Sequence, residues 1–236
     1  MAFQFISSGS TLVDLTLGGG FALGRFANIV GDPSTGKTQF AIELMTNFLR
    51  QYPGGMVQFC DAEGAFDQDY AQILGLPVDD VTFTQKDKSG LISVETWGND
   101  LAKFVKKVPD GKPALYILDS LDMLPMADWS EEMLKPECKI PGFAAAKRAE
   151  LIGQIIKTQT QFIESKDVCF ILICHAKDKM NSTVPGVKTF SGGSYPKYSA
   201  SQQLLLKHIG QVSKTVEKLK VVYGVRVSVK CAKNKC

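Results

Sequence analysis

Residues 26–50 read FANIVGDPSTGKTQFAIELMTNFLR, and their pattern is the strongest indication of the fold. The apolar run at 26–30 predicts a buried strand, and the apolar residues from Phe40 to Leu49 recur at the spacing of a helix. Between them, residues 31–38 match the pattern G-x-x-x-x-G-K-[ST] at every fixed position. Strand, loop and helix in this order are the context that a phosphate-binding loop requires, so we expect a P-loop (Walker A) nucleotide site.

The residues of the predicted loop have different chemical roles. Its glycines let backbone N–H groups turn towards phosphates, and the start of the helix adds its dipole. We expect Lys37 to reach the β and γ oxygens of ATP and Thr38 to supply a ligand to Mg²⁺. The nucleotide-binding residues predicted here are Gly31, Asp32, Pro33, Ser34, Thr35, Gly36, Lys37 and Thr38.

Further apolar runs at 56–60, 114–118 and 168–174 are continuous rather than alternating, as in strands buried on both faces. Helix-period segments at 94–108 and 145–163 lie between them. Strands alternating with helices predict an α/β fold with a mainly parallel, twisted sheet flanked by helices.

The end of the chain has a different pattern. QLLLKHIG, SKTVEKLKVVYG and VRVSVKC are Val-rich and separated by glycines, so we expect antiparallel strands added at the C-terminal edge of the sheet. Residues 128–144 and 176–199 are polar, rich in Pro, Gly or Lys, and lack sustained periodicity. Long segments of this kind in a compact domain are often functional loops.

Composition and charge limit the class of protein. The 236 residues suffice for one large domain, and no stretch approaches a membrane span or a secretion signal, so we expect a cytoplasmic protein. The six cysteines form no C-x-x-C pair, which argues against zinc and a disulfide framework. Residues 207–236 carry eight Lys or Arg against one Glu, whereas the rest of the chain is acidic. Such a basic segment is usually a solvated face or tail, but it also suits a polyanion.

Two acidic sites follow predicted strands. Asp119 ends the apolar run ALYILD. The second magnesium ligand is expected at the carboxyl end of a strand beside the phosphate loop, and Asp119 occupies such a position. Asp61 and Glu63 follow MVQFC in the stretch QFCDAEGAFDQDYA. Glu63 lies beyond the strand end, from where it can orient or deprotonate water, and Asp61 can brace the turn. The alternative is a solvated turn, with an exposed acid beside Gly64.

Several segments resemble the RecA family of DNA strand-exchange ATPases, in the order and spacing of that family. DAEGAFDQDYA is similar to the segment after its second core strand, and ALYILDS to its magnesium-site strand. GSTLVDLTLGGGFALGRFANIVGDPSTGKT resembles its first core segment, and SGGSYPKYSAS the end of its second DNA-binding loop. The final KNK resembles a basic motif that caps ATP across a subunit interface.

The resemblance implies roles for residues that spacing alone leaves open. It makes Glu63 the catalytic acid, and it places Asp67 and Tyr70 against the adenine. His175 occupies the position of a polar sensor of the γ-phosphate, and histidine there is similar to the phage UvsX-type branch. Lys233 and Lys235 would stabilise the transferred phosphoryl group of a neighbouring subunit. Without the resemblance, His175 is a capped strand end and the two lysines belong to a basic tail.

Segments 128–144 and 176–193 resemble the two DNA loops of the family, which hold single-stranded DNA by its backbone. Because the first loop also carries Glu131, Glu132 and Glu137, a solvated loop without DNA contact stays an alternative for it. The DNA-binding residues predicted for the two loops are Lys147, Arg148, Lys177, Lys179, Lys188, Gly192 and Gly193.

Taken together, these motifs predict one RecA-like ATPase core domain over residues 1–236, without the N-terminal docking element and the C-terminal domain of the family. The implied protein is a recombination and repair ATPase that uses ATP and Mg²⁺, binds single-stranded DNA and also duplex DNA, and forms a homo-oligomer or filament. It would be a minimal phage-type relative, acting in the host cytoplasm, or a truncated chain. Two alternatives stay open: a single-strand annealing or mediator protein with weak ATPase activity, and a hexameric helicase or loader subunit.

Overall fold

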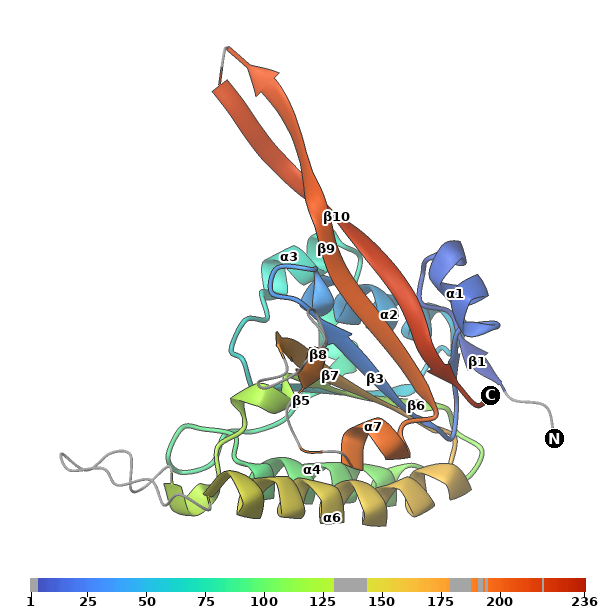
Figure 1. The fold of residues 1–236 in the computed structure, drawn as a ribbon. Helices are drawn as coiled ribbons and strands as arrows, with labels where there is room; N and C mark the ends of the chain where they lie inside the picture. The colour runs from blue at the N-terminus through green and yellow to red at the C-terminus, as the bar shows by residue number, and fades with distance from the viewer. Residues whose placement is uncertain (1–3, 130–143, 179–187, 191–192, 194, 218) are drawn as a thin grey trace.

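A mainly parallel sheet forms the centre of the protein, and its strand order is β10-β9-β3-β7-β6-β4-β5 (Figure 1). The computed structural model describes residues 4–129, 144–178, 188–190, 193, 195–217 and 219–236. Neighbouring strands from β9 to β5 run parallel, and β10 is antiparallel to β9. The predicted fold class is therefore confirmed.

The elements follow one another as strand and helix along most of the chain. The strands are β1 (Phe5–Ile6), β2 (Phe21–Ala22), β3 (Phe26–Gly31), β4 (Met56–Asp61), β5 (Val81–Phe83), β6 (Ala114–Asp119), β7 (Val168–Asp178), β8 (Lys188–Phe190), β9 (Gln202–Val216) and β10 (Leu219–Asn234). The helices are α1 (Thr11–Leu17), α2 (Lys37–Gln51), α3 (Gln68–Ile73), α4 (Val94–Lys107), α6 (Ala144–Ser165) and α7 (Tyr195–Ser199), with 3₁₀ turns η1 (Val78–Asp80) and η2 (Leu121–Met123).

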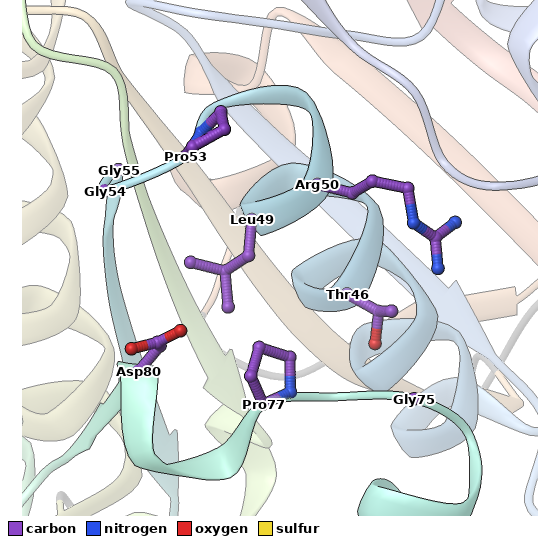
Figure 2. A pocket seen from close by; sticks show the side chains of 9 residues that line it. All are labelled: Thr46, Leu49, Arg50, Pro53, Gly54, Gly55, Gly75, Pro77 and Asp80. Atoms are coloured by element: carbon purple, nitrogen blue, oxygen red, sulfur yellow. The ribbon is translucent and has the colours of Figure 1, made fainter.

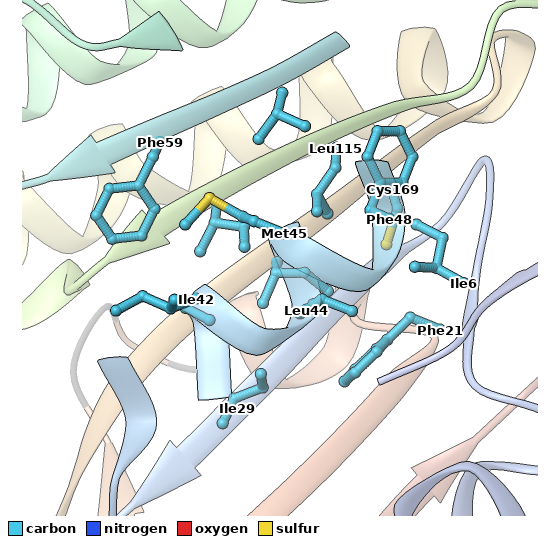
Figure 3. Close-up of a cluster of buried hydrophobic side chains, with 14 of the residues drawn as sticks. Ile6, Phe21, Ile29, Ile42, Leu44, Met45, Phe48, Phe59, Leu115 and Cys169 are labelled. Carbon is cyan, nitrogen blue, oxygen red and sulfur yellow. The ribbon is translucent and has the colours of Figure 1, made fainter. Parts of the chain in front are cut away.

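The sheet is covered on both faces, which explains why its strands are apolar without alternation. Helix α2 covers one face, and α4 and α6 cover the other (Figure 1). On β3, Ala27 and Ile29 face the α2 cluster, whereas Phe26 and Val30 face the α4–α6 cluster, because side chains alternate between the two faces along a strand. Figure 3 shows the α2 cluster, where Met45 and Phe48 pack over the strands. This packing holds the carboxyl ends of β3, β4, β6 and β7 in one row.

The predicted antiparallel strands at the C-terminal edge are two long strands rather than three shorter ones. The sequence pattern predicts turns at Gly210 and Gly224, but Gly210 pairs with Arg226 and Gly224 with Val212. Gly224 lies at a register shift, where a glycine is easily accommodated. The chain reverses between Val216 and Leu219 instead. Only the first part of β9 pairs with β3, so β9 and β10 extend beyond the sheet as a two-stranded arm (Figure 1).

The segment 176–199 also contains more regular structure than its sequence pattern predicts. Strand β7 continues to Asp178, β8 pairs with it, and α7 follows. Two of these elements are too short for a periodic signal, and β7 gains its extension from tertiary pairing. Of the first predicted DNA loop, at 128–144, residues 130–143 lie outside the described residues. Among the helices that the structure describes, none has the length and apolar character needed to cross a bilayer.

Candidate nucleotide and DNA site

The phosphate loop connects β3 to α2, and its backbone has the conformation of an anion cradle. Ser34 and Gly36 both have positive φ, +57° and +76°. A side chain on Gly36 would meet open space, so the glycine is needed for its backbone conformation rather than for room. At Gly31 the lack of space requires a glycine, because an added Cβ would lie 2.7 Å from Thr35 Oγ1. The first turn of α2 then directs its N–H groups at the loop, as phosphate binding requires.

Lys37 lies inside this cradle. Its ammonium donates hydrogen bonds to the carbonyl oxygens of Asp32 at 3.0 Å and Gly31 at 3.4 Å, and the residue is only 6% exposed. Burial lowers the pKa of Lys37, while the carboxylates of Asp119 and Glu63 act against that shift. When a nucleotide binds, its phosphate oxygens would replace these two carbonyl oxygens as partners of the ammonium.

The residues present fit a magnesium ion beside the loop. Thr38 Oγ1 donates to Asp119 Oδ2 at 2.6 Å, across 81 positions of sequence. Asp119 is 1% exposed, and its other oxygen, Oδ1, is buried without a hydrogen-bond partner among the described residues. Desolvation raises the pKa of Asp119 to about 6, against the effect of the Thr38 hydrogen bond. A hydroxyl and a carboxylate with a vacant oxygen are ligands that Mg²⁺ prefers.

The raised pKa predicts that replacement of Asp119 by asparagine stabilises the protein in magnesium-free buffer. Its carboxyl titrates near 3.8 when unfolded and near 6 when folded, so between these values the folded state binds more protons and its stability falls as pH rises. We expect Asp119→Asn to raise the free energy of unfolding by up to about 3 kcal/mol above pH 6 and by little below pH 4. Urea unfolding at several pH values measures this, with the exposed Asp79→Asn as control. A gain independent of pH would contradict it.

The stretch that contains Glu63 is built around Asp61. The Asp61 carboxylate accepts hydrogen bonds from the N–H groups of Gly64, Ala65 and Phe66, at 2.8, 3.2 and 3.2 Å. This confirms the prediction that Asp61 braces the turn. The N–H of Glu63 also donates to the carbonyl oxygen of Asp119 at 3.1 Å, which ties the stretch to the end of β6. The alternative of a solvated turn is therefore wrong for Asp61.

Glu63 points towards the end of β7. Its Oε2 lies 3.4 Å from Nε2 of His175, and the side chains are 32% and 23% exposed. His175 is paired in register with Gly31, the first residue of the phosphate loop. The structure therefore brings together Lys37, Thr38, Asp119, Glu63 and His175 at one edge of the sheet. This is the arrangement that a water-activating acid and a phosphate sensor would need.

Asp67 and Tyr70 lie at the start of α3. Asp67 is the N-cap of this helix, and its carboxylate accepts from the N–H of Tyr70 at 3.0 Å. Tyr70 is 42% exposed, so its ring is available to a flat ligand. Contact of the two residues with adenine stays a prediction.

Lys233 and Lys235 lie at the opposite end of the sheet from the phosphate loop of their own chain. The ammonium of Lys233 donates to the carbonyl oxygens of Tyr198 and Lys197, at 2.7 and 3.2 Å. The adjacent Asn234 pairs with Gln202, which pairs with Ala27, whereas the loop begins at Gly31. Four residues of strand correspond to about 13 Å. The two lysines are therefore remote from the cradle that precedes α2.

The predicted DNA-binding residues are only partly within the described structure. Lys177 pairs with Asp122 at 2.9 Å, and Lys147 with Asp128 at 3.2 Å. Arg148 donates from Nε to the carbonyl oxygen of Leu124 at 2.8 Å and from Nη2 to that of Leu121. Burial lowers the pKa of Arg148. The other positions are Lys188, whose backbone lies in β8, Gly193, which has positive φ, and Lys179 and Gly192, which lie outside the described residues.

Sequence reasoning missed one residue of this region, Asp122. Its carboxylate contacts both the backbone N–H of His175 and the side chain of Lys177. The only signal in the sequence was an acid three positions after Asp119, within an otherwise apolar segment. Nothing local distinguishes such an acid from a solvated turn residue.

A cavity of about 550 Å³ lies at the far end of α2 and does not belong to this site (Figure 2). Thr46, Leu49 and Arg50 line it from the helix, and Asp80 faces them. Thr46 lies nine positions beyond Lys37, roughly 13 Å along the helix. The carboxyl end of a helix also repels phosphate, because its dipole is negative there. Phosphate binding is therefore expected at the loop and not in this cavity.

Comparisons with known proteins agree with this geometry. A family model described as the RecA N-terminal domain matches residues 1–236. The chain is similar to proteins called Protein RecA from Nostoc punctiforme, at 31% identity, and from Synechococcus sp. (strain WH7803), at 29% identity. Both alignments cover all of this chain but only 60% and 56% of those relatives, so the chain spans less than two thirds of their length. Since the family model matches the whole sequence, the chain belongs to the RecA N-terminal domain family.

Proposed function

We propose that this protein is a recombination and repair ATPase that binds single-stranded DNA and hydrolyses ATP to ADP and phosphate between two copies of the chain. One observation carries the proposal. The phosphate loop, the Thr38–Asp119 pair and Glu63 converge at the same sheet edge as His175, three residues before β7 ends at Asp178. A nucleotide-dependent change at His175 would thus reach the second predicted DNA loop directly.

The residues of the site divide the work of hydrolysis. The loop N–H groups and Lys37 hold the phosphates, and Glu63 accepts a proton as a water oxygen attacks the γ-phosphorus and the bond to the β–γ bridging oxygen breaks. His175 beside Glu63 orients the acid before ATP arrives. A magnesium ion held by Thr38 and Asp119 would neutralise charge on the β and γ oxygens. Tyr70 and Asp67 would contact the adenine.

The position of Lys233 and Lys235 supports hydrolysis between two copies. They are remote from the loop of their own chain, and Lys233 would exchange its contacts with the carbonyl oxygens of Lys197 and Tyr198 for the phosphates bound by a neighbour. A cation supplied in this way stabilises the charge that develops on the transferred phosphoryl group. Contact between different surfaces of identical subunits produces a filament or a ring. The 1–236 unit would then be one ATPase core domain whose activity depends on assembly.

The DNA surface would be formed by the two predicted loops, with Lys177, Lys188 and Gly193 in the second and Lys147 and Arg148 after the first. Lysines bind the phosphate backbone without reading sequence, which suits single-stranded DNA and also permits duplex DNA. The proposed reaction requires ATP and DNA in one compartment, which fits a cytoplasmic location, in the host if the chain is phage-encoded.

Replacement of Glu63 by glutamine tests the function directly. Glutamine keeps the size of the side chain but cannot accept the proton of water, so we expect DNA-stimulated turnover to fall at least about 100-fold while ATP still binds. Phosphate release is measured with and without single-stranded DNA, and Glu43→Gln on α2 serves as the matched control. A rate that ignores DNA in the parent and is unchanged in Glu63→Gln would remove the mechanism.

A further inference from the structure

Asp122 connects the turn after the magnesium strand to the end of β7. It lies in η2, three residues after Asp119. Its Oδ2 accepts a hydrogen bond of 2.7 Å from the backbone N–H of His175, and its Oδ1 pairs with Lys177 Nζ at 2.9 Å. One carboxylate thus fixes two residues on the strand that leads towards the second predicted DNA loop.

This carboxylate is buried while its charged partner is not. The Asp122 side chain is 7% exposed and that of Lys177 is 56% exposed. Burying a carboxylate is unfavourable unless hydrogen bonds and a nearby cation compensate, and a small apolar residue would fill a turn without that cost. The residue therefore does more here than fill space.

The turn that carries Asp122 is itself held in place from a second direction. Arg148, near the start of α6, donates to the carbonyl oxygens of Leu121 and Leu124, on either side of Asp122. The backbone of Asp119 accepts from the N–H groups of Ala62 and Glu63 at 2.7 and 3.1 Å. The turn thus contacts the Glu63 stretch, β7 and α6, so a displacement of any one of them acts on Asp122.

We propose that Asp122 is a positioning residue that holds His175 against Glu63. This role of Asp122 rests on the proposed function, in which Glu63 activates water. The His175 backbone N–H is anchored by Asp122, and its ring then reaches Glu63, with Nε2 at 3.4 Å from Oε2. Lys177, two residues further on, is held by the same carboxylate, so DNA phosphates that draw Lys177 away also loosen the anchor of His175. DNA bound at the second predicted loop would thereby change the position of His175 beside Glu63.

Nuclear magnetic resonance of the histidine rings tests the positioning without any enzymatic assay. The chain has two histidines, His175 and His208, so a His208→Gln variant assigns both ring signals. In the parent, Glu63→Gln should displace the Cε1–H signal of His175 and leave that of His208 unchanged. In the Asp122→Ala background, the same substitution should displace the His175 signal by less than a third as much. Asp122→Asn keeps an acceptor for the His175 N–H and should restore more than half of the displacement.

Turnover supplies the second readout. With single-stranded DNA, we expect Asp122→Ala to lower kcat at least tenfold and to change KM for ATP less than threefold, with Asp122→Asn in between. If Asp122→Ala does not fold, Asp122→Ser replaces it, because its shorter side chain cannot span both partners. Equal displacement of the His175 signal in both backgrounds would overturn the proposal, whatever the rates. A parent whose ATPase ignores DNA would instead overturn the proposed function, and the resonance result would still decide the positioning.

Discussion

Replacement of Lys37 by alanine is expected to lower DNA-stimulated ATP turnover by about 100- to 1,000-fold. The ammonium is held inside the loop by the carbonyl oxygens of Gly31 and Asp32, at 3.4 and 3.0 Å. It is 6% exposed, and a charge in such surroundings acts on a phosphate more strongly than one in water. Its loss removes positive charge both from bound ATP and from the transition state, so binding and turnover should fall together.

Steady-state phosphate release and binding of a fluorescent ATP analogue measure the two effects of Lys37→Ala separately. The matched control is Lys106→Ala, an exposed lysine in the last turn of α4 on the other side of the sheet. Circular dichroism verifies that the variant is folded. If Lys37→Ala retains turnover within fivefold of the parent, the loop at 31–38 is not the catalytic phosphate site.

The paired change of Lys233 and Lys235 to alanine is expected to reduce turnover about 100-fold or more, although both residues are remote from the loop of their own chain. In the proposed mechanism, the copy of the chain that supplies the cations differs from the copy that binds the phosphates. Nucleotide binding should change much less than turnover, because these cations act on the charge that develops during transfer.

Mixing two inactive variants distinguishes supply by a neighbour from supply within one chain. Subunits with Lys37→Ala keep Lys233 and Lys235, and subunits with the paired change keep Lys37. In an equal mixture, random assembly makes about a quarter of the interfaces intact, so activity should return to that order. The Lys106→Ala subunit mixed with Lys37→Ala is the control for subunit exchange. Failure to recover activity in a mixed assembly that electron microscopy shows as a filament or ring would refute supply by a neighbour.

Much of this fold can be predicted from the sequence because its signals are local. The runs that became β3, β4, β6 and β7 are apolar without interruption, since helices cover both faces of the sheet. The arm of β9 and β10 was harder to predict, because glycine marks a turn in some contexts and a bulge in others. Gly224 lies at a bulge, and the reversal uses Glu217 with φ of +50°. Pairing over the whole length of both strands decides between these two roles.

The predicted phosphate site is recognisable without a structure, because all of its parts are contiguous: a strand, the motif at 31–38 and the first turn of a helix. Which distant groups meet there depends on tertiary contacts. Thr38 and Asp119 are 81 positions apart, and Asp122 reaches His175 across 53. Such contacts depend on strand order and register, which bring β6 and β7 side by side with their carboxyl ends aligned. A single acid in a turn contains no information about the strand end that it will face.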